Sequence, residues 1–312
     1  MVKTAVLVAS YNGEHFIGEQ LESIRNQTLA PDYVLFRDDC SSDNTVAFIE
    51  DYIKKHQLDN WKISVNKSNV GWRRNFKALM QDVLDVDCDY IFFSDQDDQW
   101  YLDKNQKQVQ IMEENPTIEL LSADIDIKKM SEDASIPNNF QFSDAEKPLS
   151  KYPADFSSIN YRQGWTFCMR RSLIEDCMRY YGEDLLLSHD NLIAGVARVM
   201  GVAYNYNRPV GVHKRHGKNA SGNLLNIRSP HQRHMEDLKF VLSYYTVLKS
   251  VLKQRNLPEQ AVAEDYYRFY KKRYDFANSR NFFGTIHQML TQGTYYDSWS
   301  NRLRDAIFLF KK

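Results

Sequence analysis

Short apolar runs alternate with helical apolar patterns over the first 130 residues. Each run has the length of a strand buried on both faces, and most are followed by a segment with apolar residues at helical spacing. The predicted strands are 4–10, 32–36, 61–65, 90–94 and 118–123, and the predicted helices are 14–27, 44–56 and the segment marked by Phe76, Leu79, Met80 and Val83. This alternation predicts an α/β fold, with a mostly parallel sheet flanked by helices and joined by right-handed crossovers.

Beyond residue 130 the pattern is less regular. Residues 131–160 are polar and predict a long loop or insertion, and a mixed region follows. The later predictions are a helix at 190–200, a strand at 202–206, an irregular polar loop at 213–222, and helices at 231–255, 259–280 and 299–310. We therefore expect a catalytic or ligand-binding body over residues 1–230 and a helical C-terminal region over residues 231–312.

Charge separates these two parts. The chain of 312 residues has 40 Lys and Arg against 41 Asp and Glu, which excludes a generally basic, nucleic-acid-binding coat. Residues 231–312 nevertheless hold 14 Lys and Arg against 8 Asp and Glu, a net charge of +6. The C-terminal region is therefore predicted to be a cationic extension.

Cysteine and apolar content bear on the compartment. The four cysteines have no CxxC spacing, so we expect free thiols in a reducing compartment. The apolar segment 4–9 is too short for a signal peptide, and no stretch approaches the roughly 20 apolar residues that cross a bilayer. We expect a cytoplasmic protein, and we expect any membrane contact to be peripheral, on the inner face.

The residues that follow the predicted strands are polar and strongly acidic. Ligands of parallel sheets gather at the carboxyl ends of the strands, which here are followed by residues 11–13, 37–39, 66–71 and 95–98. No GxGxxG follows the first strand and no GxxxxGK[ST] occurs in the chain. These absences argue against a dinucleotide-dependent oxidoreductase and a P-loop enzyme.

Asp95 and Asp97 are candidate cation ligands. Two carboxylates at i and i+2, on a turn after a buried strand, can converge on one hard cation. Mg²⁺ or Mn²⁺ held there would neutralise charge on a diphosphate leaving group. The alternative is a solvated acidic loop that caps the next helix.

Further candidates lie after other predicted strands and at helix starts. The carboxylate of Asp39 can accept the N3–H of a pyrimidine. Arg73 and Arg74 open a helix at which guanidinium and helix N-terminus could both face a phosphate, the alternative being a solvated face. Asp190 begins a helical pattern and is either a cap or a general base. A cationic loop could clamp a diphosphate, supply a metal ligand or be solvated: His213, Lys214, Arg215, His216 and Lys218.

Taken together, these segments resemble the family 2 glycosyltransferases, which have the GT-A fold. The matching motifs are VLVASYNG at 6–13, Q-x2-SI-x2-Q at 20–27, RDDCSSDNT at 37–45, N-x-G at 69–71 with Asn75, and DQDDQW at 95–100 followed by Lys104. A looser match extends through GWT at 164–166, HD at 189–190 and HGKNASG at 216–222. Cys40 replaces a glycine of the family pattern, and His189 replaces the acidic residue that usually precedes the base.

The resemblance implies roles for particular residues. It implies a GT-A catalytic domain with a nucleotide-sugar half at 1–125 and an acceptor half at 126–230. Asp190 stands where the family has its catalytic base. The implied contacts to the nucleotide sugar are Ser10, Tyr11, Asn12, Asp39, Asn69, Arg73, Asp95, Gln96 and Trp165, and the implied ligands of Mg²⁺ or Mn²⁺ are Asp95, Asp97 and His216.

Within the family, DQDDQW with a late RHGKNASG looks most like rhamnosyltransferases that assemble cell-wall polysaccharides. This implies an inverting, metal-dependent enzyme that moves L-rhamnose from dTDP-β-L-rhamnose onto a lipid-linked cell-wall saccharide. A UDP-hexose or UDP-N-acetylhexosamine transferase and a non-catalytic sugar-nucleotide-binding subunit remain open. A nucleotidyltransferase is disfavoured because its Gly-rich, basic phosphate loop is missing.

The C-terminal helices have two interpretations. Their aromatic and aliphatic stripes could pack on the catalytic body or form the seam of a homodimer. Alternatively, cation-rich helices with such a stripe can lie peripherally in the interface of an anionic membrane, for which residues 299–312 are the better candidate.

Overall fold

A computed structural model describes residues 2–130, 140–142, 144–185, 187–215, 229–296 and 298–311 of the chain. Contacts divide the chain into two compact units. Unit 1 comprises Met1–Ala154, Asn160–Met178 and Ser188–Asn219, and unit 2 comprises Asp155–Ile159, Arg179–Leu187 and Ala220–Lys312. Unit 1 contains the sheet, whereas unit 2 is built mainly from helices.

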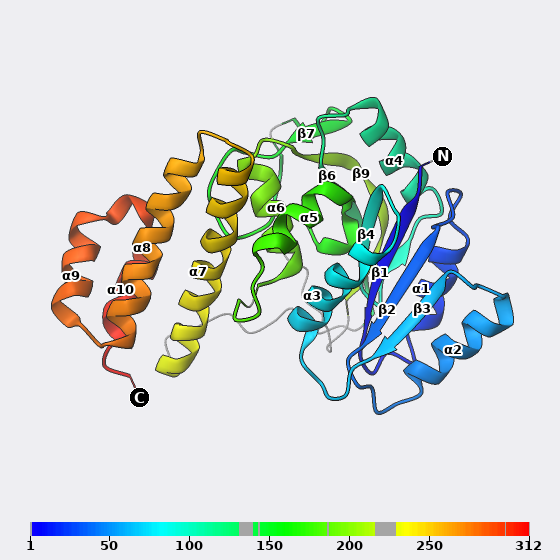
Figure 1. Cartoon of the computed structure of the whole chain (residues 1–312), viewed down its shortest axis with the longest axis horizontal. Helices are drawn as coiled ribbons and strands as arrows, with labels where there is room; N and C mark the ends of the chain where they lie inside the picture. Colours follow the sequence, from blue (N-terminus) through cyan, green and yellow to red (C-terminus); the bar gives the residue numbers. More distant parts are fainter. Residues whose placement is uncertain are drawn as a thin grey trace. The chain divides into compact units, whose positions relative to one another are not determined.

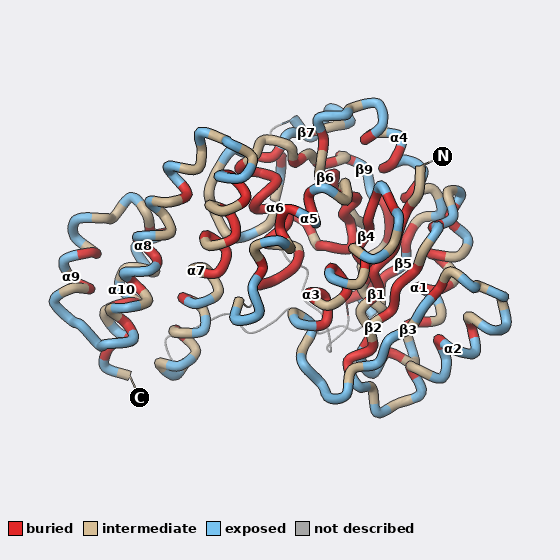
Figure 2. The backbone as a smooth tube through the Cα atoms, in the orientation of Figure 1, coloured by how far each residue is buried: buried red, intermediate tan, exposed pale blue. Residues whose placement is uncertain are grey.

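Four parallel strands form one part of the sheet, in the order β3-β2-β1-β4 (Figure 1). Their bounds are Thr4–Ser10 for β1, Tyr33–Asp38 for β2, Trp61–Val65 for β3 and Tyr90–Ser94 for β4. Strands β1 and β4, which lie inside the full sheet, are buried along nearly their whole length (Figure 2). Burial on both faces explains why their sequences are continuous apolar runs, and all four predicted strands are confirmed.

The remaining strands make the sheet mixed. They are β5 at Gln99–Trp100, β6 at Leu120–Lys129, β7 at Leu149–Lys151, β8 at Cys168–Arg170 and β9 at Ala203–Arg215. The short strand β8 lies antiparallel between β4 and β6, and thereby joins the first parallel block to a second one made by β6 and β9. Both β5 and β7 pair antiparallel with β9.

Strand β9 corrects one prediction. Residues 213–215 continue the strand as partners of the end of β6, whereas the sequence predicted an irregular loop from residue 213. These basic residues can lie in a strand because carboxylates pair with them. The side chain of His213 is hydrogen-bonded to Asp98, and that of Lys214 to Glu19. The rest of that predicted loop, 216–222, lies outside the described residues. Strand β7 lies within the segment 131–160, which was predicted to be a loop.

Helices cover both faces of the sheet in unit 1. They are α1 at Ile17–Arg25, α2 at Thr45–His56, α3 at Trp72–Asp82, α4 at Lys104–Glu114, α5 at Arg171–Tyr180 and α6 at His189–Val199. Helices α1, α2 and α4 pack on the face that carries Val6, Val34 and Phe92. On the opposite face, Phe93 meets Phe76 of α3 and His189 of α6.

Two of these helices, α4 and α5, were not predicted. The side of α4 that is buried carries three polar residues, Lys104, Asn105 and Gln108, so its apolar pattern is weak. The buried apolar positions of α5 are confined to Leu173, Ile174 and Cys177, which is too short a pattern to separate from the mixed region around it.

Unit 2 is built around four helices: α7 at His231–Gln254, α8 at Gln260–Asn278, α9 at Phe282–Thr291 and α10 at Trp299–Phe308. Three of them were predicted, and α9 was not. A buried ion pair ties α10 to α8, since Arg273 donates to both oxygens of Asp305 at 2.8 and 2.7 Å. Within the described part of the chain, no helix is long and apolar enough to span a membrane.

Cys40 occupies a turn that favours glycine. Its φ is 64°, in the left-handed region that L-residues avoid because the side chain crowds the following carbonyl. The thiol is exposed, so no packing of the side chain compensates for this strain. The family pattern has glycine here, and the observed backbone gives the physical reason.

The aromatic pocket of His189 fixes the start of α6. Its ring stacks on Phe76 with centroids 3.6 Å apart and meets Phe93 edge-on at 4.6 Å. Burial lowers the pKa of His189 to about 4, although the neighbouring Asp190 acts in the opposite direction. The imidazole is therefore neutral at pH 7, and the helix begins without the negative charge that the family pattern places there.

We expect the substitution Cys40→Gly to stabilise the protein. Removing the side chain relieves a left-handed conformation that costs about 1–2 kcal/mol, partly offset by the larger backbone entropy of glycine, so the free energy of unfolding should rise by about 0.5–1 kcal/mol. Urea unfolding measures this change. Cys40→Ala is the matched control, because it removes the thiol and keeps the strain. Equal stability of the two variants would contradict a strained turn.

We expect His189 to make stability depend on pH. Its pKa of about 4 in the folded chain lies below the value of 6.5 for a free side chain, so the unfolded chain takes up a proton first as the pH falls. Stability is therefore lost on acidification between about pH 6.5 and 4. From pH 7 to pH 5 the parent should lose about 2 kcal/mol more unfolding free energy than His189→Phe. Parallel pH profiles from urea unfolding would exclude this role.

Candidate active site

The carboxylate of Asp38 organises the ends of β1 and β2. It is fully buried and accepts three hydrogen bonds, from Ser10 Oγ, from the main-chain N–H of Ser41 and from Ser41 Oγ, each at 2.7 Å. The hydroxyl of Ser10, a predicted nucleotide-sugar contact, therefore donates a hydrogen bond to Asp38. The sequence analysis gave Asp38 no role, yet it closes the β2–α2 loop onto β1.

Gln96 joins the loop after β1 to the loop after β4. Its side-chain amide donates to Tyr11 O at 2.9 Å and accepts from Tyr11 N at 2.8 Å. The contact requires glycine at position 13, because a Cβ added at Gly13 would lie 2.2 Å from Gln96 Oε1. Asn12 binds the β2–α2 loop by accepting from Ser42 N at 2.9 Å. The Tyr11 ring is left 46% exposed beside these contacts.

Asp39 holds the loop between β3 and α3. One carboxylate oxygen accepts from Asn66 Nδ2 at 2.9 Å and from Val70 N at 2.8 Å, and the other accepts from Gly71 N at 2.8 Å. A carboxylate has about four acceptor positions, so about one remains for a ligand. Asn69, in the loop that Asp39 holds, is exposed.

Arg73 lies in the first turn of α3. Its guanidinium lies 5.0 Å from the centre of the Trp72 ring, and the Trp72 ring meets His189 edge-on at 6.1 Å. Asn75, which matches the family motif, donates to Arg37 O at 2.7 Å and so fastens this helix to β2. A helix N-terminus and a guanidinium together favour a bound phosphate.

Helix α1 anchors the acidic segment after β4. Two buried polar residues of this helix, Gln20 and Ser23, lie on one side together with Gln27, just after its end. The amide of Gln20 bonds the Ser94 hydroxyl at 2.8 Å, and Ser23 Oγ accepts from Trp100 N at 3.3 Å. Gln27 Nε2 donates to Tyr101 O at 2.9 Å. The Q-x2-SI-x2-Q motif therefore binds the side chain of Ser94 before DQDD and the main chain of Trp100 and Tyr101 after it.

Four carboxylates gather at the end of β4: Asp95, Asp97, Asp98 and Asp190. Burial, together with repulsion by the other three carboxylates, raises the pKa of Asp95 well above its usual range. Asp190 comes from α6, far along the sequence, so the fold brings the predicted base and the predicted cation ligands into one electrostatic environment. This region of negative potential favours a bound cation.

A cation at these carboxylates would find only part of its ligands among the described residues. Among the residues that the structure describes, no three His, Cys, Asp or Glu side chains are placed to hold a metal ion together. His216, the predicted partner of Asp95 and Asp97, lies outside the described residues. Mg²⁺ is often held by one or two carboxylates together with substrate phosphates, so the residues present fit a cation shared with a diphosphate.

The sequence analysis missed the contact of His213 with Asp98. His213 Nδ1 lies 2.6 Å from Asp98 Oδ1. Burial raises the pKa of Asp98 to about 6, and the bond to His213 acts in the opposite direction. Trp165 is buried and stacks on the His213 ring with centroids 6.3 Å apart. Asp98 and His213 are 115 residues apart in the sequence, and no motif indicates a contact over that separation.

Asp190 lies in the first turn of α6. Its Oδ1 accepts from Asn191 N at 2.8 Å and from the Ser188 hydroxyl, so the residue takes part in capping the helix. The turn that contains Gly164 passes directly beside it, since a Cβ added at Gly164 would lie 3.0 Å from Asp190 Cβ. Asp190 thus both caps α6 and lies beside the acidic cluster.

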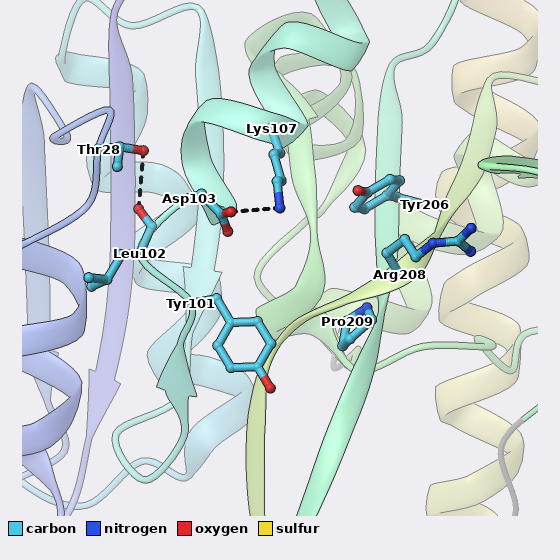
Figure 3. A pocket seen from close by; sticks show the side chains of 8 residues that line it. All are labelled: Thr28, Tyr101, Leu102, Asp103, Lys107, Tyr206, Arg208 and Pro209. Atoms are coloured by element: carbon cyan, nitrogen blue, oxygen red, sulfur yellow. Dashed lines mark hydrogen bonds and ion pairs between the residues drawn. The ribbon is translucent and has the colours of Figure 1, made fainter.

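A shallow cavity of about 670 Å³ lies elsewhere on unit 1 (Figure 3). Its lining residues are Thr28, Tyr101, Leu102, Asp103, Lys107, Tyr206, Arg208 and Pro209. Figure 3 shows the ion pair of Lys107 and Asp103, 2.6 Å long, on one side and Arg208 on the other. None of the predicted site residues lines this cavity.

Comparison with known sequences shows the family. The sequence model described as "Glycosyl transferase family 2" matches residues 5–177. The chain is 27% identical over 234 residues to the dTDP-rhamnosyl transferase RfbG of Shigella flexneri, which covers 72% of this chain and 77% of that protein. It is 29% identical over 196 residues to the poly(ribitol-phosphate) beta-N-acetylglucosaminyltransferase TarS of Staphylococcus aureus, which covers 62% of this chain and 32% of TarS.

Solved structures show the same fold. The structure of residues 1–349 of S. aureus TarS in complex with UDP-GlcNAc matches with a TM-score of 0.62 at 19% identity, covering 99% of this chain and 81% of that one. The mannosyltransferase PcManGT from Pyrobaculum calidifontis, in complex with GDP-Man and Mn²⁺, matches with a TM-score of 0.51 at 14% identity, covering 98% and 85%. Since the family model covers more than half of the chain, the chain belongs to glycosyl transferase family 2 and is a glycosyltransferase with the GT-A fold.

Proposed function

We propose that the chain transfers L-rhamnose from dTDP-β-L-rhamnose to a hydroxyl group of a lipid-linked cell-wall saccharide, with inversion at the anomeric carbon. The observation that carries the proposal is that the start of α6, which holds Asp190, packs on the end of β4, where the His189 ring lies 4.6 Å from the Phe93 ring; Asp190 is one of the carboxylates that raise the pKa of Asp95 there. A base for the acceptor and carboxylates for the donor's diphosphate therefore share one site. The choice of rhamnose is supported by the similarity to dTDP-rhamnosyl transferase RfbG.

On the donor side, Asp95 and Asp97 would hold Mg²⁺ or Mn²⁺. Bound there, the cation would neutralise charge on the departing nucleoside diphosphate. The remaining acceptor position of Asp39 receives the N3–H of the thymine. Arg73 adds positive charge at the start of α3, where the helix dipole also favours phosphate. The exposed Tyr11 ring and Asn69 complete the donor contacts.

On the acceptor side, Asp190 takes the proton of the acceptor hydroxyl. The hydroxyl oxygen then forms a bond to the anomeric carbon from the face opposite the diphosphate, and the bond to the diphosphate oxygen breaks. A β-linked donor yields an α-rhamnoside. Because His189 is neutral, its side chain places no charge next to the carboxylate of Asp190.

A UDP-N-acetylhexosamine or UDP-hexose donor is the second candidate, and the similarity to TarS favours it. Thymine and uracil differ by one methyl group, whose burial is worth about 1 kcal/mol, so a similar base pocket accepts either. A non-catalytic sugar-nucleotide-binding subunit is disfavoured because Asp97 and Asp190 are both present.

A panel of nucleotide sugars, with and without Mg²⁺ or Mn²⁺, tests the donor and the cation together. We expect dTDP-rhamnose to give the fastest release of nucleoside diphosphate, and EDTA to abolish it. Asp97→Asn should lower turnover by about 10²-fold or more, because one carboxylate ligand of the cation is lost, while circular dichroism stays unchanged. Full turnover in EDTA would overturn the cation-dependent mechanism, and faster release from UDP sugars would favour the second candidate.

Asp190→Asn tests the base. Transfer to acceptor should fall by about 10²–10⁴-fold, because the amide cannot take up the hydroxyl proton. Binding of dTDP, measured by calorimetry, should stay within a few-fold of the parent, since the base contacts the acceptor and not the nucleotide. Asp51→Asn, an exposed carboxylate on α2, is the matched control. Loss of dTDP binding in Asp190→Asn would show that the residue serves only to cap α6.

A further inference from the structure

Helices α9 and α10 of unit 2 expose a row of large apolar side chains, here called the α9–α10 strip. Its members are Phe282, Phe283 and Leu290 of α9, and Trp299, Leu303, Ile307 and Phe310 on and just after α10. Four of them are mostly exposed, with exposed fractions of 85% for Phe283, 79% for Leu290, 74% for Phe310 and 72% for Trp299.

The strip is continuous along both helices. On α10 the members recur at i, i+4, i+8 and i+11, and on α9 Phe283 and Leu290 are seven residues apart, so each set lies on one side of its helix. Phe282 joins the two sets, because its ring lies 5.7 Å from both the Phe283 and the Phe310 rings. Figure 1 shows α9 and α10 side by side.

The opposite sides of the two helices already pack inside unit 2. Asp305 and Phe308 of α10 and Thr285 and Gln288 of α9 are buried, and Gln288 donates to Phe269 O of α8 at 3.0 Å. The strip is therefore not the core-facing side of either helix. A continuous apolar surface of this kind on a folded chain marks an interaction site.

Basic residues flank the strip. They are Arg280, Arg302, Arg304 and Lys311. Arg280 donates to Leu309 O at 2.9 Å, and Lys311 donates to Ser229 O at 3.3 Å. Carbonyl oxygens carry no formal charge, so these bonds do not neutralise either cation. The guanidinium of Arg302 lies 4.5 Å from the centre of the Trp299 ring. Tryptophan beside arginine at the edge of an apolar face is typical of helices in a lipid interface.

We propose that the α9–α10 strip is the surface by which the enzyme lies on an anionic lipid bilayer. Charge decides between a bilayer and a second copy of the chain, because a symmetric dimer through the strip would bring the flanking cations together, whereas anionic head groups attract them. The bilayer as partner accords with the lipid-linked acceptor of the proposed function, but the strip itself carries the inference.

Vesicle sedimentation with the full chain tests the inference. The probes are vesicles of phosphatidylglycerol mixed with phosphatidylcholine, and vesicles of phosphatidylcholine alone. Two double variants remove the anchors of each helix, Phe283→Ser with Leu290→Ser, and Trp299→Ser with Phe310→Ser. Each should weaken partitioning onto the anionic vesicles at least about tenfold. Ile159→Ser is the matched control, because Ile159 is 66% exposed and does not belong to the strip.

Charge and activity provide the remaining readouts. Arg304→Gln with Lys311→Gln should reduce binding to anionic vesicles several-fold, and high salt should reduce binding of the parent. Donor hydrolysis should stay unchanged in every variant, so that a failure here is distinct from a failure of the proposed reaction. Equal sedimentation of the parent and both double variants would overturn the inference. So would a parent that is dimeric by light scattering and becomes monomeric in the double variants.

Discussion

The four carboxylates at the end of β4 are the constraint on which unit 1 depends. Burial and then mutual repulsion raise the pKa of Asp95, so ionising these groups together opposes folding unless other groups hold them in place. Polar residues on and just after α1 bind the Ser94 hydroxyl before the acidic segment and Tyr101 O after it, and β9 brings His213 to the buried Asp98. Segments from the first 30 residues and from beyond residue 200 thus meet at one short stretch of chain.

Two adjacent carboxylates show how the loops around this site are ordered before any ligand binds. Asp38 draws donors from β1 and from its own loop, whereas Asp39 draws donors from the loop after β3. Gln96 adds a third connection by pairing with the main chain of Tyr11. The loops at the carboxyl ends of four neighbouring strands are therefore fastened to one another, and rigid loops of this kind preserve the geometry of a site.

The sequence predicted the parts of the fold whose signal is local. Strands β1 and β4 were predicted with their observed bounds because strands buried on both faces are continuous apolar runs. Helix α4 could not be found in this way, since its buried side carries Lys104, Asn105 and Gln108. Lys104 in particular lies with Nζ 4.0 Å from the Trp100 ring centre, in a cation–π contact that no periodicity reveals.

The site likewise contains residues that the sequence predicted and contacts that it could not predict. The carboxylates after β4 were predicted from their position at the end of a buried strand. The motif showed that Cys40 replaces a glycine, and the structure adds that its backbone is left-handed. The partners of Asp39 and Gln96 could not be predicted, because they are main-chain groups of loops whose path depends on the whole sheet. His213 was assigned to a loop because its neighbours are basic, and only the positions of Asp98 and Glu19 explain a strand there.

The attachment of Asp39 to the β3–α3 loop limits how such an enzyme can change its substrate. Because the same carboxylate folds the loop and is the proposed contact of the nucleotide base, replacing it would cost stability and donor recognition at once. Changes that adapt the enzyme to another nucleotide are then expected at side chains that do not hold the loop in place. Asn69 and Val70, both of which are exposed, are examples. Asp39 is therefore expected to stay unchanged during evolution. Similar chains that prefer different donors are expected to differ at the positions beside it.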